Sequence, residues 1–251
     1  MIFSWLKNRR RRKLLARPFP ETWLEHLRTN VDHYGRLPSD AQQKLSDKTV
    51  IFVAEKHWTG CGGLEMTDEI KVTIAAQACV LLLGIEGDYL FDGIFSILVY
   101  PAAYAPPPEE RDGLVDLDVT HLGEAWHRGP VVLSWRHVLA GSRGHDDGQN
   151  LVIHEFAHQL DGLDGTPPLG SRQQYRDWQA VTDREYRRLV RQASEGAVTL
   201  LDDYGASSRA EFFAVASECF FQKPREMLAR HPDLFELLRS FYKQDPTTWA
   251  W

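Results

Sequence analysis

Two histidines and a glutamate lie close together in the segment NLVIHEFAHQLDG, residues 150–162. In a helix, the four-residue spacing puts His154 and His158 on one face, about 40° apart around the axis and about 6 Å apart along it. Both imidazoles could therefore bind one ion, and zinc suits neutral imidazole ligands. Glu155 lies about 100° around from His154, close enough to contact a zinc-activated water without being a ligand. The pattern predicts a zinc site for hydrolysis.

The residues that flank this motif are nearly all apolar, which predicts a largely buried helix: Leu151, Val152, Ile153, Phe156, Ala157 and Leu160. A chance occurrence of the motif in a solvated helix is the alternative. Burying two histidines and a glutamate costs free energy unless a partner such as a metal ion compensates, so the apolar flanks favour the metal site. A catalytic zinc has three protein ligands and one water, so a third ligand is needed.

Three carboxylates are candidates for this third ligand. Asp164 lies six residues after the second histidine, where some zinc peptidases carry their last ligand, but Asp161 replaces the glycine at which that chain turns back. Glu211, in YGASSRAEFFAVASECFF, would complete a set of two histidines and one glutamate. However, Ser208 and Glu211 also have capping-box spacing, in which Glu211 would only cap a helix. Glu218 follows seven residues later on nearly the same face. The residue patterns leave the three candidates open.

The rest of the chain predicts the elements that must hold these residues. Segments 93–101 (GIFSILVYP) and 129–135 (GPVVLSW) have the β-branched and aromatic content of strands. Segment 72–85 (VTIAAQACVLLLGI) is interrupted by Gln77, is too short to span a membrane and predicts a buried core helix. Helical patterns follow at 150–160, 171–194, 208–222 and 232–243. We therefore predict an α+β fold with a small mixed sheet and a helical C-terminal part.

Charge is distributed unevenly along the 251 residues. The net charge is −6, but the basic residues before the first acid, Glu21, contribute +7, so the remainder carries −13. The run KNRRRRK, residues 7–13, could contact anionic lipid or RNA, although a short solvated tail is the simpler interpretation. We expect a flexible basic tail over residues 1–19 and a single domain over residues 20–251. The negative net charge argues against general nucleic-acid binding.

The sequence also bears on the compartment. The opening MIFSWL is too short to span a bilayer, and its basic residues follow the apolar ones, unlike those of a secretory signal. The three cysteines are odd in number, far apart and without CxxC spacing: Cys61, Cys79 and Cys219. They indicate neither a disulfide framework nor a structural zinc knuckle. We therefore expect a cytoplasmic protein without a transmembrane segment.

Four segments together resemble the Mlc titration factor A family of bacterial zinc peptidases: GPVVLSW, NLVIHEFAHQLDG, YGASSRAEFFAVASECFF and LFELLRSFYKQDP. The resemblance runs from about residue 20 to residue 246. It implies a zincin-like metallopeptidase domain whose HExxH motif lies on the active-site helix. It also implies one Zn2+ per chain, held in the gluzincin manner by His154, His158 and Glu211. Glu218 would then support the site from outside or lie on the helix surface.

Two further residues are candidates near the metal. Tyr204 precedes Glu211 by seven residues, a spacing that related gluzincins share and in which the tyrosine hydroxyl points at the zinc. Taken alone, a tyrosine in such a loop is more often a packing residue. Asp161 follows His158 by three residues and could orient the other ring nitrogen of a ligand, or could simply be the last helical residue before Gly162.

The predicted reaction is hydrolysis of a peptide bond by metal-activated water. Glu155 would be the general base, and the Tyr204 hydroxyl would help to hold the oxyanion. Strand 129–135 is expected at the sheet edge, where it would pair with an extended peptide substrate. The family resemblance implies aminopeptidase-like cleavage, although no acidic cluster for a free α-amino group is evident. Segments 106–113 (PPPEERDG) and 140–149 are candidate lids.

A different class of function is the alternative. The chain could sequester a transcriptional repressor, as the Mlc-related family name implies, with a structural zinc and no catalysis. Intact Glu155 argues against a purely structural site, because a metal clamp needs its ligands but no base beside the water. Both roles could also coexist on different surfaces.

Overall fold

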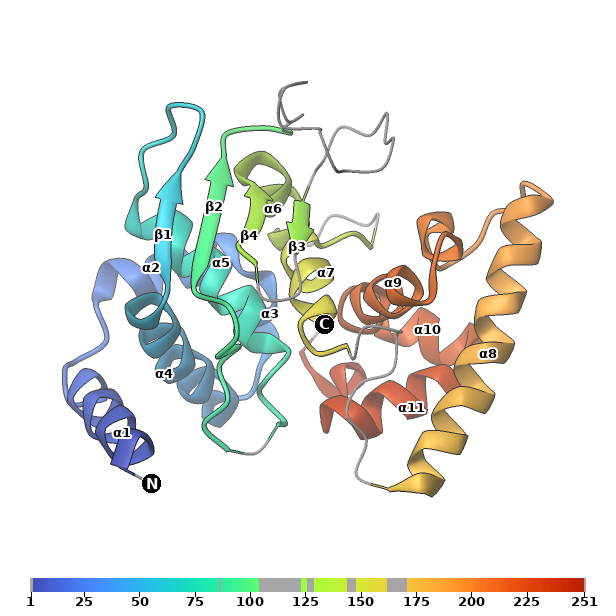
Figure 1. Cartoon of the computed structure of the whole chain (residues 1–251), viewed down its shortest axis with the longest axis horizontal. Helices are drawn as coiled ribbons and strands as arrows, with labels where there is room; N and C mark the ends of the chain where they lie inside the picture. Colours follow the sequence, from blue (N-terminus) through green and yellow to red (C-terminus); the bar gives the residue numbers. More distant parts are fainter. Residues whose placement is uncertain are drawn as a thin grey trace.

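A computed structural model describes residues 2–85, 87–103, 123–125, 129–143, 148–161 and 171–250 (Figure 1). Its α-helices are α1 (Ile2–Leu15), α2 (Glu21–Asn30), α3 (Asp32–Arg36), α4 (Ser39–Glu55), α5 (Asp68–Val80), α6 (Trp135–Ser142), α7 (Leu151–His158), α8 (Arg172–Ser194), α9 (Arg209–Gln222), α10 (Pro224–Arg230) and α11 (Pro232–Tyr242). Its strands are β1 (His57–Gly60), β2 (Ser96–Tyr100), β3 (Gly123–Ala125) and β4 (Val131–Ser134), and two short 3-10 helices are η2 (Asp203–Ala206) and η3 (Pro246–Thr248).

The four strands form one small mixed sheet in the order β1-β2-β4-β3. Strands β1, β2 and β4 are parallel, whereas β3 is antiparallel to β4. The strand predicted at 129–135 is present as β4, but its predicted place at the sheet edge is wrong. Val131 and Leu133 of β4 are buried in the core, and β4 is hydrogen-bonded to a neighbour on each side. The edge beside it is formed by β3, which the sequence patterns did not predict.

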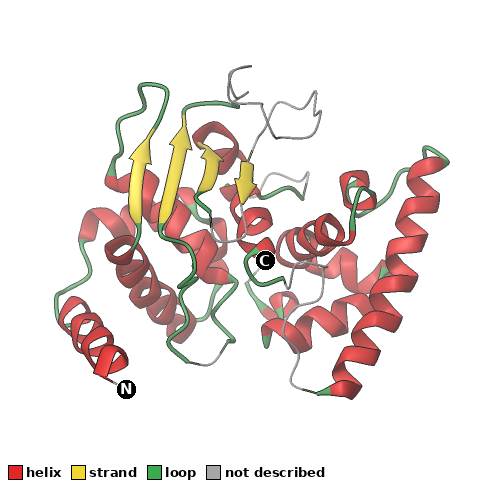
Figure 2. Ribbon diagram, viewed as in Figure 1, coloured by secondary structure: helices red, strands yellow, loops and turns green. Residues whose placement is uncertain are grey.

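Helices cover the sheet and continue beyond it (Figure 2). Helix α5 is buried along almost its whole length, which confirms the core helix predicted from its apolar run. Helices α8 to α11 lie on the side of α7 away from the sheet, and their bounds confirm the predicted helical C-terminal part. Helix α7 therefore lies between the sheet and the C-terminal helices. Within the described residues, no helix combines the length and apolar content needed to cross a membrane.

A helix occupies most of the segment that we expected to be a flexible tail. Helix α1 packs against α4, where Arg11, only 5% exposed, donates hydrogen bonds of 2.8 and 2.7 Å to the two carboxylate oxygens of Glu55. Lys7 forms a second ion pair with Asp92 at 2.8 Å. Arginine and lysine favour helices, and a two-point arginine–carboxylate pair fixes orientation, so the basic run forms a helix that is held against the body.

Candidate metal centre

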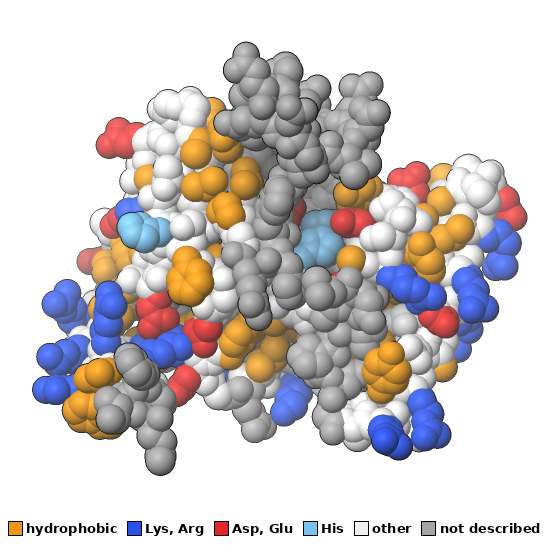
Figure 3. Space-filling model, in the orientation of Figure 1, with side chains coloured by type: hydrophobic (Ala, Val, Ile, Leu, Met, Phe, Trp, Pro, Cys, Tyr) orange, Lys and Arg blue, Asp and Glu red, His pale blue; other side chains and the backbone are white. Residues whose placement is uncertain are grey.

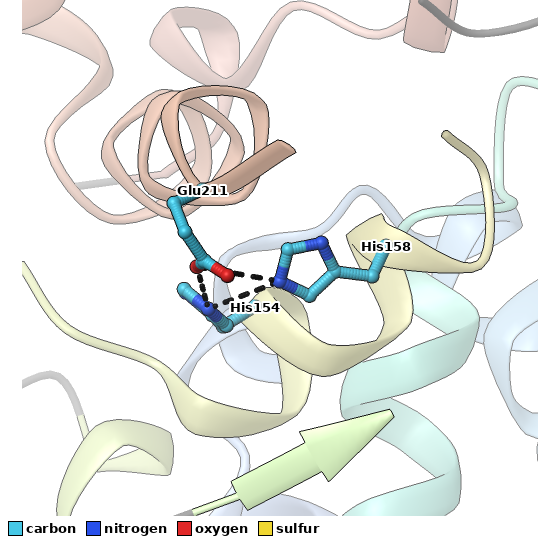
Figure 4. A group of neighbouring side chains, drawn as sticks. All are labelled: His154, His158 and Glu211. Carbon is cyan, nitrogen blue, oxygen red and sulfur yellow. Dashed lines mark hydrogen bonds and ion pairs between the residues drawn. The ribbon is translucent and has the colours of Figure 1, made fainter. Parts of the chain in front are cut away.

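Two capped helix starts bring the candidate metal ligands together. Helix α7 begins after Asn150, whose side-chain oxygen accepts a hydrogen bond from the backbone N–H of Ile153 at 3.0 Å. Helix α9 begins after Ser208, whose hydroxyl accepts one from the backbone N–H of Glu211 at 3.1 Å. Because α7 packs along α9, the first turn of α9 faces the polar side of α7. Figure 4 shows His154 and His158 pointing from α7 toward Glu211.

The donor atoms of these three residues have the spacing of zinc ligands. The Oε2 atom of Glu211 lies 3.0 Å from Nε2 of His154 and 3.4 Å from Nε2 of His158, and the two Nε2 atoms are 3.3 Å apart. Tetrahedral ligands at the usual bond length of about 2.0–2.1 Å are separated by about 3.3–3.4 Å. The donor set therefore fits one tetrahedral zinc ion with a fourth position left over. Among the described residues, it is also the one cluster with such spacing.

The electrostatics of the site favour a positive charge between these ligands. Burial works against charge on His154, but hydrogen bonds with Glu211 and Glu218 raise the pKa of its imidazole well above the usual value. Burial likewise works against charge on Glu211, yet its hydrogen bonds with the two histidines lower the pKa of the carboxyl group to about 2. A proton or a metal cation between these side chains would supply the positive charge that the pKa shifts favour. The two Nε2 atoms face each other, so one cation could bind to both.

Glu155 is the buried neighbour of His154 on α7. Its side chain is only 4% exposed, and burial raises the pKa of its carboxyl group to about 7, although the two neighbouring histidines act in the opposite direction. A carboxyl group with a pKa near neutrality can both take up and release a proton at physiological pH. Glu155 could therefore transfer protons close to the candidate metal ligands.

Tyr204 lies beside the cluster on the 3-10 helix η2. Its ring centroid is 6.1 Å from that of His154, and its side chain is 55% exposed. Burial and the charges of Glu211 and Glu155 raise the pKa of its phenol, so the hydroxyl keeps its proton at neutral pH and can donate a hydrogen bond. Gly205 lets η2 approach α9 closely, because a Cβ atom at this position would come within 3.2 Å of Val215.

Glu218 contacts His154 from outside the cluster. Its Oε1 atom lies 2.7 Å from Nδ1 of His154, and its Oε2 atom accepts a hydrogen bond of 2.6 Å from the backbone N–H of Asn150. The Asn150 side chain in turn donates a hydrogen bond of 2.8 Å to Gln77 on α5. Sequence reasoning did not single out Asn150 or Gln77 for the site. The only indication in the sequence was that each is a polar residue among apolar neighbours, and in the structure both side chains are completely buried.

The remaining candidates have different outcomes. Glu211 keeps half of the predicted capping box, because Ser208 accepts its N–H, but its carboxylate faces the histidines instead of turning back to the helix start. Asp161 is buried just beyond α7, and its predicted role in orienting a ligand stays a prediction. Asp164, the candidate lid 106–113 and residues 144–147 of the second candidate lid lie outside the described residues.

The cluster reaches the surface of the molecule. Figure 3 shows histidine and acidic side chains together near the middle of one face. The side chains of His154, His158 and Glu211 are 13%, 16% and 21% exposed. A small molecule or an extended chain segment could therefore contact the donor atoms without unfolding of either helix.

Comparisons with known proteins agree with this chemistry. The family model described as glucose-regulated metallo-peptidase M90 matches residues 5–243. An uncharacterized protein of Synechocystis sp. is 37% identical over 245 residues, which cover 94% of this chain and 89% of the relative. Mlc titration factor A of Klebsiella pneumoniae subsp. pneumoniae is 35% identical over 224 residues, and that of Escherichia coli O7:K1 is 32% identical over 220 residues. Each of these two matches covers 84% of this chain and 82% of the relative.

Proposed function

Because the chain belongs to the glucose-regulated metallo-peptidase M90 family, we propose that it is a zinc-dependent peptidase of the gluzincin type. The observation that carries this proposal is the convergence of donor atoms from His154, His158 and Glu211 at the spacing of tetrahedral zinc ligands. When bound there, zinc would act as a Lewis acid and would bring the pKa of a water molecule down to about 7.

Glu155 is the proposed general base. It would accept a proton from the attacking water and then return it to the nitrogen of the leaving amine. Its burial and its pKa of about 7 support both steps, because the carboxyl group is close to the midpoint of its titration at neutral pH. No covalent intermediate with the protein is required.

Tyr204 is the proposed hydrogen-bond donor to the oxyanion. The peptide carbonyl oxygen becomes negatively charged as water adds to the carbon, and a protonated phenol can stabilise this charge. The position of the Tyr204 ring next to that of His154, together with its exposed side chain, supports this role. The hydroxyl would contact the substrate from the side of η2.

The substrate backbone is proposed to pair with β3. This strand pairs with β4 on one side, lies at the edge of the described sheet and packs beside α7. An extended peptide added to such an edge would be recognised mainly through backbone hydrogen bonds, with little selection among side chains. Aminopeptidase-like cleavage in the cytoplasm is the activity that we propose within this class.

Metal analysis and peptide hydrolysis test the proposal directly. We expect about one zinc per wild-type chain, and loss of zinc and hydrolysis together in Glu211→Ala. Glu226→Ala, which removes an exposed glutamate from α10, is the matched control and should retain both. Cleavage of peptides with free but not blocked amino termini would support the aminopeptidase assignment. Full zinc retention in Glu211→Ala would refute the ligand set.

Binding of a transcriptional repressor is the second candidate function. The observation that favours it is the name Mlc titration factor A, borne by relatives 31–35% identical to this chain. We propose a repressor-binding surface separate from the metal ligands, so that Glu155→Gln would abolish hydrolysis and preserve binding. A non-catalytic protein with a structural zinc would instead bind both the metal and the repressor, and the wild type would cleave no peptide.

A further inference from the structure

Helix α1 presents a face that is both basic and apolar to solvent. The exposed side chains of this face are Trp5, Leu6, Arg9, Arg10, Arg12 and Lys13. Figure 3 shows basic side chains next to hydrophobic ones in the region where Figure 1 places α1. The guanidinium carbon of Arg9 lies 5.5 Å from the centre of the Trp5 ring, so cationic and aromatic groups are directly adjacent. This set of six residues is called the α1 face below.

The inward cations of the helix are neutralised, whereas the outward ones are not. Arg11 pairs with Glu55, and Lys7 pairs with Asp92, which anchors α1 to the body. Within the described part of the chain, the four cations of the α1 face have no carboxylate within ion-pair distance. Anchoring needs only the inward residues, so it does not account for the four exposed charges.

A groove of about 470 Å3 continues this surface between α1, α4 and residues 87–90. Trp5 and Arg12 belong to both the α1 face and the groove, where Lys48 and Ile51 of α4 lie opposite them. Burial and the nearby positive charges of Lys44 and Arg11 lower the pKa of Lys48, although Cys79 and Asp88 oppose this shift. The groove also contains Asp47 and Asp88, but its cations outnumber these two acids. Positive charge and apolar surface therefore occur together in the groove as well.

We propose that the α1 face and its groove dock the protein onto a bilayer that contains anionic phospholipids. Basic side chains are attracted to anionic headgroups, and tryptophan and leucine side chains can enter the region between headgroups and acyl chains. A bilayer would bury the exposed side chain of Leu6 and so remove its apolar surface from water, whereas single-stranded RNA offers no apolar interior to bury it. The association is peripheral and reversible, and it is independent of the proposed peptidase chemistry.

The charge of the rest of the chain sets the orientation on the membrane. The basic residues before Glu21 contribute +7 to a net charge of −6, so the remainder carries −13 and is repelled by an anionic surface. Only the part of the molecule within about a Debye length of the membrane experiences this field strongly. The basic end of the chain is therefore held at the bilayer while the acidic body faces away from it.

Cosedimentation of the full-length protein with lipid vesicles tests this proposal. We expect binding to vesicles that contain phosphatidylglycerol, no binding to phosphatidylcholine alone, and weaker binding as the salt concentration rises. The variant Arg9→Gln/Arg10→Gln/Arg12→Gln/Lys13→Gln should bind at least about tenfold more weakly, because each basic residue near the surface contributes to the attraction. Trp5→Ala/Leu6→Ala should also weaken binding while preserving the requirement for phosphatidylglycerol.

A matched variant on α8 separates a specific surface from total charge. Arg172, Arg176, Arg187 and Arg191 are exposed on that helix, and changing all four to glutamine removes the same charge. This variant should bind vesicles like the wild type, and circular dichroism should show that both quadruple variants are folded. Equal loss in the two variants, wild-type binding by the α1 variant, or binding of polyuridylate without binding of anionic vesicles would overturn the proposal.

Discussion

Glu218 of α9 holds the imidazole of His154 on α7, with Oε1 of the carboxylate 2.7 Å from Nδ1 of the ring. A carboxylate accepts hydrogen bonds, so Nδ1 carries a proton, which makes Nε2, directed at Glu211, the nitrogen that can bind a metal ion once its own proton is displaced. The second oxygen of Glu218 accepts the N–H of Asn150 at the start of α7. One side chain therefore sets both the ring orientation and the tautomer that a metal ligand requires.

Glu218→Gln should weaken zinc binding without removing a ligand. An amide is a poorer acceptor than a carboxylate and would no longer favour the proton on Nδ1 of His154, so we expect about 10- to 100-fold lower affinity. Competition with a zinc chelator measures this change. Glu226→Gln, on the exposed surface of α10, is the control and should bind zinc like the wild type. Unchanged affinity in Glu218→Gln would show that Glu218 has no influence on the metal.

Glu155→Gln should keep zinc and lose hydrolysis. The amide fills nearly the same buried volume but cannot accept the proton of water, so we expect kcat to fall by about 10²- to 10⁴-fold. Elemental analysis and peptide hydrolysis are measured on the same preparation, which separates loss of the base from loss of the metal. Cleavage at the wild-type rate would rule out Glu155 as the base.

Tyr204→Phe should lower kcat more than it changes KM. The hydroxyl is proposed to act on charge that develops during the reaction, and losing one such donor typically costs about 10²- to 10³-fold in rate. The aromatic ring remains, and the residue is exposed, so the melting temperature should be unchanged. An increase in KM alone would instead indicate that Tyr204 contributes only to substrate binding.

Protonation of His33 should lower the free energy of unfolding in mild acid. Burial lowers the pKa of its imidazole to about 4, even though the Phe221 carbonyl raises it, whereas the unfolded chain has a pKa of about 6.5. Between these values the unfolded state binds a proton that the folded state does not. The stability that comes from the neutral form of buried His33 is therefore fully present above about pH 6.5 and is lost as the pH falls toward 4.

Urea unfolding at two pH values measures this effect. From pH 7 to pH 5, His33 should remove about 2 kcal/mol from the free energy of unfolding. His33→Gln cannot take up this proton, so its free energy of unfolding should fall by about 2 kcal/mol less over the same interval. Comparing the change in each protein cancels the contribution of all other titrating groups. The same pH dependence in both proteins would contradict the assignment.

The sequence alone determined the features that depend on neighbours along the chain. His154, Glu155 and His158 belong to consecutive turns of one helix, so helix geometry places them before any other element is known. The helical patterns of α9 and α11 likewise predicted these helices close to their actual bounds, and the apolar run at 72–85 predicted a buried helix, which the structure places slightly earlier as α5. Helix formation depends on interactions within about four residues, so these helices can be predicted without knowledge of the rest of the fold.

Tertiary structure decided the features that join distant segments. Glu211 and Glu218 lie 57 and 64 residues after His154, so their contacts with it depend on the packing of α9 along α7. Residue patterns left both as candidates, and family resemblance alone favoured Glu211 as the ligand. The place of β4 inside the sheet and the pairing of Arg11 with Glu55 are also long-range. Such contacts arise only when the whole chain has collapsed around its core, because spacing along the sequence does not specify which helix faces meet.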